Sequence, residues 1–280
     1  FLVGLFFIWI GSSGCSKQLV WYQWSKQLGL YIQKTLDKSM KIAIIFIGTS
    51  KYANFFEGFK NAVDNHFLTD HEKKFFVFTD QPELDIFDSE DVHVTKISHV
   101  GWPWITLHRF KFMTYVKDEL NKFDYVFFID ADLWPCSKIG NEILDHGKPL
   151  IGVQHPGFLG KIGTYETNTN STANIFDGFY DLQIYRQGCF WGGRASNIVE
   201  MITKLDIRVD KDTENDIVAV WHDESHMNKY FLENNDFVHT LHPGYATPQQ
   251  GYENIKAKYK IMMVHLHKDL SEFPRFARSK

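Results

Sequence analysis

The stretch Phe123-Asp-Tyr-Val-Phe-Phe-Ile-Asp-Ala-Asp-Leu133 decides the fold of this chain. Residues 126–129 form an unbroken β-branched and aromatic run, typical of a central parallel strand covered on both faces. Asp130 and Asp132 follow directly, where ligands collect in open α/β sheets. Two such carboxylates could hold a hard divalent cation together with the phosphates of a substrate. The motif alone leaves open a second interpretation, in which Asp130 only caps the following turn.

Length and composition limit the class of protein. The 280 residues suffice for one large domain or two small ones, and 44% hydrophobic with 23% charged residues predicts a sizeable core. The aromatic content of 16% fits a Phe-rich core, and also a carbohydrate or nucleotide binder. A net charge of −4 gives no nucleic-acid footprint, so no nucleic-acid partner is expected. Cys15, Cys136 and Cys189 are too widely spaced to indicate a disulfide framework or a zinc cluster.

The N-terminal part divides the chain into two expected regions. Residues 1–10 are apolar, but they are too few to span a membrane. Residues 16–39 could form an amphipathic stem helix. We therefore expect a hydrophobic segment and stem over residues 1–39 and one domain over residues 40–280. If residues 1–39 are native, the protein is expected to be membrane-anchored; if Met40 is the true start, it is expected to be cytoplasmic.

From Lys41 onward, strand and helix patterns alternate, which predicts a mostly parallel sheet. Before the opening stretch, the pattern predicts strands at 42–47, 75–79 and 91–97 and helices at 52–67 and 106–120. After it, the pattern predicts a strand at 150–154, a glycine-rich turn at 188–193, a helix at 197–205 and a helix ending near 234. The polar residues 161–180 predict a long loop, and a loop of that length in a compact domain is usually functional.

A second dense cluster is His222-Asp-Glu-Ser-His226. Two histidines four residues apart on a helix suit zinc, but a metalloprotease needs glutamate directly after the first, and Asp223 stands there. In the preferred interpretation Asp223 or a neighbour caps a helix and Glu224 lies in its first turn. Glu224 shares a side with Met227 and Phe231, so its inward carboxylate needs a partner. An ordinary capping-box acid remains the alternative.

Several motifs occur in the order seen in family 6 glycosyltransferases, the family of the histo-blood-group A and B transferases, the α-1,3-galactosyltransferase and bacterial relatives. The motifs are Val77-Phe-Thr-Asp-Gln-Pro82, Asp130-Ala-Asp132, His155-Pro-Gly-Phe158, Thr164-Tyr-Glu166, Phe190-Trp-Gly-Gly193 and Trp221-His-Asp-Glu-Ser-His-Met-Asn-Lys-Tyr230. The resemblance covers about residues 40–280. Gly101-Trp-Pro103 and the start near Met40 resemble the bacterial branch, whose members lack the anchor and stem.

The resemblance implies a GT-A fold, an α/β fold with a Rossmann-like nucleotide-binding mixed sheet flanked by helices and an acceptor-binding half. It implies a retaining transfer of galactose or N-acetylgalactosamine from a UDP-sugar to the 3-hydroxyl of a β-galactoside, forming an α-1,3 linkage. The expected partners are a UDP-sugar donor and a β-galactoside or fucosylated galactoside acceptor glycan. Many bacterial relatives replace both acids by asparagine and work without metal. Because this chain keeps Asp130 and Asp132, we expect it to depend on a divalent ion, Mn²⁺.

The resemblance also assigns roles to single residues. Glu224 matches the essential glutamate beneath the anomeric carbon, either as a nucleophile or as a stabiliser of an oxocarbenium-like transition state. Asp130 and Asp132 match the metal site. The donor-binding positions are Ile47, Tyr52, Arg109, Asp130, Ala131, Asp132, Gln187, Gly188, Cys189, Asp223, Lys268 and Arg275; Lys268 with Arg275 or Arg278 resembles a basic tail that closes over the diphosphate. The acceptor-binding positions are His155, Thr167, Trp221 and Glu224.

Two departures from the family pattern affect specificity. Gln187-Gly188-Cys189 stands where the blood-group enzymes choose between sugars. Cys189 is larger than Gly or Ala, which favours UDP-galactose, but one pocket group gives only modest discrimination. Gly244-Tyr-Ala-Thr-Pro-Gln249 lacks the acid that mammalian members use on the acceptor, so the acceptor and its need for fucose stay open. The alternatives are a non-catalytic UDP-sugar or glycan-binding relative and, from residues 1–10 alone, a membrane-tethered structural protein.

Overall fold

The structure is a computed structural model, which describes residues 39–144, 146–175, 182 and 184–268. The predicted N-terminal segment and stem, apart from residue 39, lie outside the described residues, as does Arg275. Within the described part of the chain, no helix is both long enough and apolar enough to cross a membrane.

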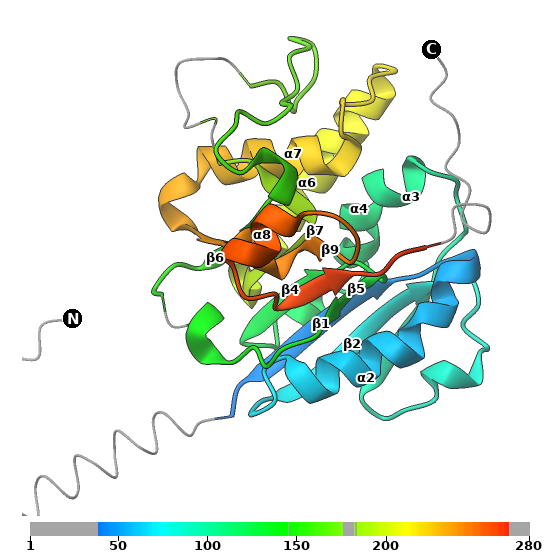
Figure 1. The fold of residues 1–280 in the computed structure, drawn as a ribbon. Helices are drawn as coiled ribbons and strands as arrows, with labels where there is room; N and C mark the ends of the chain where they lie inside the picture. The colour runs from blue at the N-terminus through cyan, green and yellow to red at the C-terminus, as the bar shows by residue number, and fades with distance from the viewer. Residues whose placement is uncertain (1–38, 145, 176–181, 183, 269–280) are drawn as a thin grey trace, which may run out of the picture. The chain divides into compact units, whose positions relative to one another are not determined.

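A seven-stranded sheet with the order β3-β2-β1-β4-β7-β6-β8 forms the centre of the domain (Figure 1). Its strands are β1 (Lys41–Ile47), β2 (Glu72–Thr79), β3 (Val92–Lys96), β4 (Tyr125–Ile129), β6 (Leu150–Gln154), β7 (Arg186–Arg194) and β8 (Val238–Leu241). The first four strands of the chain run parallel to one another. β7 runs antiparallel to both β4 and β6, and β6 runs parallel to β8. The expected α/β fold with a mixed, mostly parallel sheet is confirmed.

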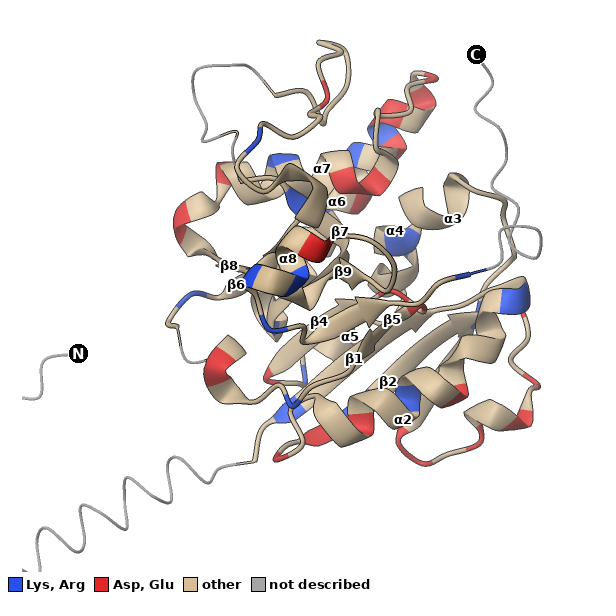
Figure 2. Ribbon diagram, viewed as in Figure 1, with Lys and Arg blue, Asp and Glu red and all other residues tan. Residues whose placement is uncertain are grey.

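Helices cover both faces of this sheet, with α2 on one face and α4, α6 and α7 on the other (Figure 1). The α-helices are α2 (Phe56–His66), α3 (Trp104–Leu107), α4 (Arg109–Thr114), α5 (Lys117–Leu120), α6 (Ala195–Glu214), α7 (His222–Glu233) and α8 (Glu253–Lys258). The 3-10 helices are η1 (Ser50–Phe55), η2 (Asp85–Phe87), η3 (Asn141–Ile143), η4 (Pro156–Phe158), η5 (Asn235–Phe237) and η6 (Pro243–Tyr245). Most charged residues lie on helices and loops, and the central strands carry few of them (Figure 2).

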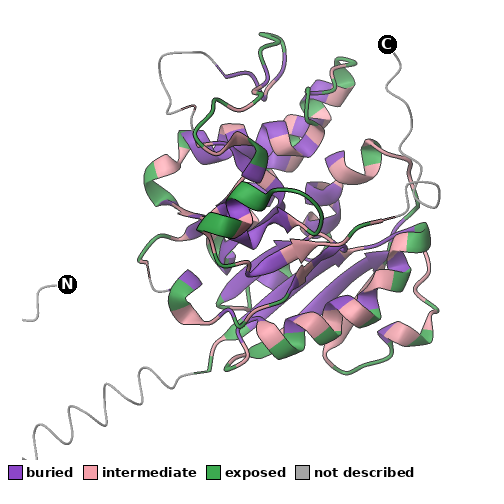
Figure 3. Ribbon diagram, viewed as in Figure 1, coloured by how far each residue is buried: buried purple, intermediate pink, exposed green. Residues whose placement is uncertain are grey.

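β4 is the strand predicted from the opening stretch, and all five of its residues are buried. Its side chains alternate between two hydrophobic clusters. Phe127 and Ile129 pack in the cluster that includes α2, whereas Val126 and Phe128 pack in the cluster that includes α4, α6 and α7. Figure 3 shows the sheet buried between helices whose outer surfaces are exposed. The uninterrupted apolar run is therefore explained by burial on both faces.

The prediction of one helix over residues 106–120 was wrong. Three short helices, α3, α4 and α5, occupy this region instead. The backbone leaves helical geometry at His108, with φ −84° and ψ 4°, and again at Val116, with φ −120° and ψ 17°. Val116 is β-branched, which lowers its helix propensity. The hydrophobic periodicity was real, but it did not reveal these two breaks.

The prediction of a glycine-rich turn over residues 188–193 was also wrong, because this segment belongs to the nine-residue strand β7. The glycines permit close packing. A Cβ atom on Gly192 would lie 2.3 Å from Cδ1 of Phe127, and one on Gly193 would lie 2.2 Å from the carbonyl oxygen of Pro149. Gly193 also has φ +152°, a conformation that side chains disfavour. The sequence pattern did not distinguish glycines required by neighbouring strands from glycines of a turn.

A second sheet of three short strands has the order β5-β10-β9. Its strands are β5 (Leu133–Pro135), β9 (Thr247–Pro248) and β10 (Met263–His265). β5 follows directly after Asp132, and β10 pairs with it in antiparallel register. This sheet therefore brings the end of the described chain beside the two acids.

Candidate active site

Asp130 and Asp132 lie immediately beyond β4, at the edge of the sheet where the sequence places a binding site. Neighbouring segments hold the backbone here. The N–H of Asp130 donates to the carbonyl of Cys189 at 2.9 Å, and the N–H of Leu266 donates to the carbonyl of Asp132 at 2.9 Å. The carbonyl of Ala131 accepts a bond from the Trp134 indole at 3.0 Å. Strand β7 and the segment after β10 thus fix both ends of the Asp-Ala-Asp turn.

Arg109, the first residue of α4, joins the Asp-Ala-Asp turn to two other elements. Its buried guanidinium donates from Nη1 to the carbonyl of Gly188 at 2.9 Å. Nε lies 3.2 Å from Oδ2 of Asp223, and Nη2 lies 3.6 Å from Oδ1 of Asp130. The group also stacks over Phe128, 4.4 Å from the ring centroid. One cation therefore compensates two carboxylates, one just beyond β4 and one on α7, as expected of a residue that supports a donor site.

We expect Arg109→Met to lower the free energy of unfolding by about 3–5 kcal/mol, because breaking a buried ion pair leaves carboxylates uncompensated. Burial already raises the pKa of Asp223, and Arg109 opposes this. Urea unfolding would measure the loss. The matched control is Arg208→Met, which removes a partly exposed pair with Glu233 at 2.7 Å and should cost no more than about 1 kcal/mol. Equal losses in both variants would contradict this assignment.

The negative charge of Asp132 is compensated by Lys268 rather than by Arg109. The ammonium of Lys268 lies 2.5 Å from Oδ2 of Asp132 and donates to the hydroxyl of Tyr52 at 3.0 Å. Burial lowers the pKa of Lys268, but the contacts with Asp132 and Tyr52 outweigh this and hold it above its ordinary value. Tyr52 lies in η1, just after β1, and Ile47 is the last residue of β1. Lys268 therefore joins Asp132 to Tyr52 near the ends of β4 and β1, whereas Ile47 packs against the hydrophobic cluster that includes α4, α6 and α7.

Glu224 lies in the first turn of α7, as predicted, and its carboxylate is held by two donors. Oε1 accepts from the hydroxyl of Tyr185 at 2.7 Å, and Oε2 accepts from the N–H of Gly188 at 2.7 Å. Burial raises the pKa of Glu224 to about 7 in spite of these two hydrogen bonds. The capping-box alternative is wrong, because the N–H of the N-cap Trp221 donates to Ser225 instead.

Of the predicted acceptor residues, His155 lies beside Tyr185, the side-chain hydrogen-bond partner of Glu224. His155 precedes η4, and its ring centroid lies 5.9 Å from that of Tyr185. Burial lowers the pKa of His155 to about 4, so the ring is neutral near pH 7. Trp221 is 36% exposed directly before α7, where a sugar can reach it. Thr167 is exposed and follows Glu166, whose Oε2 accepts from the N–H of Val220 at 2.6 Å. The polar loop is thereby tied to the start of α7.

The three positions at the start of β7 face different surroundings. A Cβ on Gly188 would lie 3.4 Å from Oδ2 of Asp223 and 3.4 Å from Cβ of Glu224, so Gly188 faces the acids. Cys189 is buried in the hydrophobic cluster on the α2 face, and burial raises the pKa of its thiol. Nε2 of Gln187 lies 3.5 Å from Nε2 of His265, a residue that the sequence did not single out. The thiol of Cys189 lies in that cluster, although the charges of Asp130 and Glu224 also raise its pKa.

The two acids after β4 fit a divalent cation that a ligand helps to coordinate. Among the residues that the structure describes, no group of three or more His, Cys, Asp or Glu side chains could hold a metal alone. Magnesium-like cations are commonly bound by one or two carboxylates plus substrate phosphates. Burial raises the pKa of Asp130 to about 7, Arg109 opposes this, and the charge of Asp132 adds to it. An added cation near Asp130 and Asp132 would relieve this repulsion.

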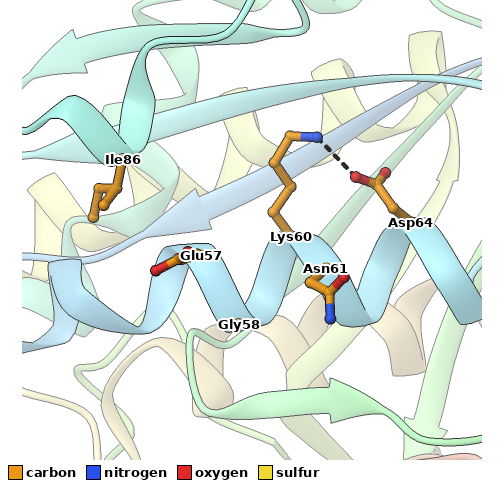
Figure 4. Close-up of a pocket in the computed structure, with 6 residues that line it drawn as sticks. All are labelled: Glu57, Gly58, Lys60, Asn61, Asp64 and Ile86. Atoms are coloured by element: carbon orange, nitrogen blue, oxygen red, sulfur yellow. Dashed lines mark hydrogen bonds and ion pairs between the residues drawn. The ribbon is translucent and has the colours of Figure 1, made fainter.

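A separate surface hollow lies along α2 (Figure 4). Its lining residues are Glu57, Gly58, Lys60, Asn61, Asp64 and Ile86. The cation in this hollow, Lys60, is already paired with Asp64 at 2.7 Å and with Asp91 at 2.8 Å. The hollow contains none of the acids after β4 or at the start of α7, so it does not mark the site.

The helix-flanked mixed sheet, with paired acids beyond β4 and a hydrogen-bonded glutamate in the first turn of α7, agrees with the GT-A glycosyltransferase fold that the resemblance implies. The chain belongs to glycosyltransferase family 6, whose family model matches residues 24–272. It is therefore a hexosyltransferase, and the resemblance seen in the sequence is confirmed.

Named relatives support this membership. The O-antigen biosynthesis glycosyltransferase WbnI of Escherichia coli is 31% identical over 220 residues, covering 78% of this chain and 93% of the relative. The histo-blood group ABO system transferase 2 of Rattus norvegicus is 28% identical over 239 residues, covering 81% of this chain and 70% of the relative. The globoside alpha-1,3-N-acetylgalactosaminyltransferase 1 of Gallus gallus is 27% identical over 223 residues, covering 73% of this chain and 62% of the relative.

Proposed function

We propose that this protein is a retaining, metal-dependent α-1,3-galactosyl- or N-acetylgalactosaminyltransferase. It would move the sugar of a UDP-sugar to the 3-hydroxyl of a β-galactoside. The observation that carries the proposal is the hydrogen-bonded carboxylate of Glu224, with Oε2 2.7 Å from the N–H of Gly188, whose carbonyl binds Arg109. Arg109 in turn contacts Asp130, so a group suited to the anomeric carbon lies beside groups suited to the diphosphate.

On the donor side, Asp130 and Asp132 would hold the divalent ion, Mn²⁺. Bound there, this ion supplies charge neutralisation for the departing UDP. Ile47 and Tyr52 would line the uridine pocket, and Lys268 would add positive charge at the diphosphate. Lys268 reaches both Asp132 and the hydroxyl of Tyr52, which supports this assignment.

At the anomeric carbon, ionised Glu224 would act in one of two ways. It could form a bond to that carbon as the bond to UDP breaks; the acceptor hydroxyl would then displace the carboxylate and give its proton to the released UDP. It could instead stabilise positive charge on the sugar while the acceptor enters on the face that UDP leaves. Both routes retain the α configuration and both need the carboxylate deprotonated, so transfer should weaken as the pH falls below the Glu224 pKa of about 7.

On the acceptor side, Trp221 would stack its ring on the apolar face of the galactoside. Neutral His155 would exchange hydrogen bonds with its hydroxyls, and Thr167 would contact it from the polar loop. The chicken relative is named a globoside alpha-1,3-N-acetylgalactosaminyltransferase, which supports the proposed α-1,3 linkage.

The test is a turnover assay with the full chain and Mn²⁺. UDP-galactose and UDP-N-acetylgalactosamine are each offered with lactose and with 2′-fucosyllactose, and UDP release is recorded with and without acceptor. We expect acceptor-dependent release, with one donor preferred by about 10- to 200-fold because the sugars differ at one group. NMR of the product should show an α linkage at the 3-position. A folded protein that binds a UDP-sugar but transfers it to neither acceptor would favour the non-catalytic alternative.

A further inference from the structure

Tyr185 stands directly before β7 and is fully buried. Its hydroxyl donates to Oε1 of Glu224 at 2.7 Å, while the N–H of Gly188 donates to Oε2. One donor on each oxygen fixes the plane of the carboxylate. Because a carboxylate offers about four lone-pair positions, each oxygen keeps one for a substrate atom. The donor from Gly188 is a backbone group, so of these two hydrogen bonds only the one from Tyr185 depends on a side chain.

Aromatic rings surround Tyr185 and leave it little freedom. Its ring centroid lies 4.9 Å from that of Phe158 and 5.0 Å from that of Tyr165. A Cβ on Gly163 would lie 2.0 Å from Cδ2 of Tyr185, so the backbone of the polar loop presses against the ring. The carbonyl of Tyr185 also accepts from the N–H of His155 at 2.8 Å. The hydroxyl is therefore oriented before any ligand arrives, and such preorganised groups cost no reorganisation during the reaction.

The proton of Tyr185 stays on the phenol. Burial and the neighbouring Glu224 both raise its pKa, so the hydroxyl remains a donor at every working pH. Three side chains act on the charge of Glu224: the hydrogen bond from Tyr185 and the cation of Arg109 lower its pKa, whereas Asp223 raises it. The hydrogen bond from Tyr185 thus opposes the rise in the Glu224 pKa that burial causes.

We propose that Tyr185 is a positioning residue for sugar transfer, whose hydroxyl holds the Glu224 carboxylate in the orientation that faces the anomeric carbon. This inference rests on the proposed function, in which Glu224 acts at that carbon. Tyr185 also connects the loop around Gly163 to Glu224, because its ring packs against that loop and its hydroxyl binds the Glu224 carboxylate.

The test is Tyr185→Phe, which keeps the ring and removes only the hydroxyl. Losing a hydrogen bond to a charged group should lower kcat by about 10- to 100-fold. The KM for the UDP-sugar should stay within about twofold, because Tyr185 is not expected to touch the donor. Since the donated bond lowers the pKa of Glu224, its loss raises that pKa, and the acid limb of the kcat/KM profile should move to higher pH.

The matched control is Tyr165→Phe, which removes a neighbouring phenol from the same cluster. The hydroxyl of Tyr165 lies 3.2 Å from the carbonyl oxygens of Leu182 and Ile184. Its loss should leave the acid limb in place. An equal movement of the limb in both variants would show general loosening of the cluster and overturn the inference.

Two further arms separate the possible failures. If Glu224→Gln is inactive while Tyr185→Phe keeps both wild-type kcat and the wild-type acid limb, the inference about Tyr185 fails and the proposed function stands. If Glu224→Gln keeps wild-type turnover, the proposed role of Glu224 itself fails. Should Tyr185→Phe not fold, site-specific 3-fluorotyrosine at position 185 keeps the hydroxyl and makes it a stronger donor. The acid limb should then move to lower pH, and an unchanged limb would overturn the inference.

Discussion

Glu224→Gln is expected to reduce sugar transfer by about 10²- to 10³-fold, the loss typical of removing one preorganised charge-stabilising group. The substitution keeps the shape of the side chain and removes its charge. The amide oxygen can still accept from the N–H of Gly188, and the hydroxyl of Tyr185 can turn to accept from the amide nitrogen. The site should therefore remain assembled. Affinity for the UDP-sugar should change little, because the lost interaction strengthens only as positive charge develops on the sugar.

Two measurements on the Glu224→Gln variant check this expectation: initial rates of UDP release with acceptor, and calorimetric titration with the UDP-sugar. The matched control is Glu233→Gln, at the end of the same helix. Glu233 pairs with Arg208 at 2.7 Å and with Lys229 at 3.8 Å at the partly exposed surface. Its loss should leave turnover unchanged. Near-wild-type turnover of Glu224→Gln would exclude the assigned role.

Removal of divalent metal with EDTA is expected to lower transfer by at least about 10²-fold, and Mn²⁺ should restore it. The charges that the structure gathers at this site explain why. Asp130, Asp132 and Asp223 face two cations, Arg109 and Lys268, which these acids already engage. With all three acids ionised, the site carries a net negative charge and repels a diphosphate. An added cation reverses this balance.

Asp132→Asn separates metal binding from other causes of lost activity. It should raise the Mn²⁺ concentration needed for half-maximal turnover. It should also reduce the Mn²⁺ bound in the presence of UDP, which electron paramagnetic resonance of the free ion measures without any turnover. Asp118→Asn, at an exposed position on α5, is the control and should change neither value. Full turnover in EDTA would remove Asp130 and Asp132 from the metal role and leave the expectation for Glu224 intact.

Much of the fold was predictable because burial on two faces leaves a clear pattern, as it does along β4. β7 was missed because its glycines resemble a turn, although they serve contacts with Phe127 and with Pro149. That error affected the site as well. Successive residues of a strand point to opposite faces. A strand over residues 186–194 would have separated Gly188, which faces the acids, from Cys189, which faces the core.

The partners of Glu224 show where sequence reasoning ended. The helical pattern indicated that this carboxylate points inward and needs a partner. Tyr185 lies 39 positions earlier in the chain, and the N–H of Gly188 is a backbone group of the kind that every residue except proline has. Neither partner could therefore be recognised from the sequence. Only tertiary packing brings these donors to the carboxylate. In contrast, Asp130 and Asp132 were predictable because the end of a strand determines their place.

Asp223 and Glu224 are consecutive, yet Asp223 contacts Arg109 while Glu224 contacts Tyr185 and Gly188. Under the proposed function, a single helical turn would therefore carry both a residue that binds the donor sugar and the residue that acts at its anomeric carbon. Any displacement of α7 would then disturb donor binding and sugar transfer at once.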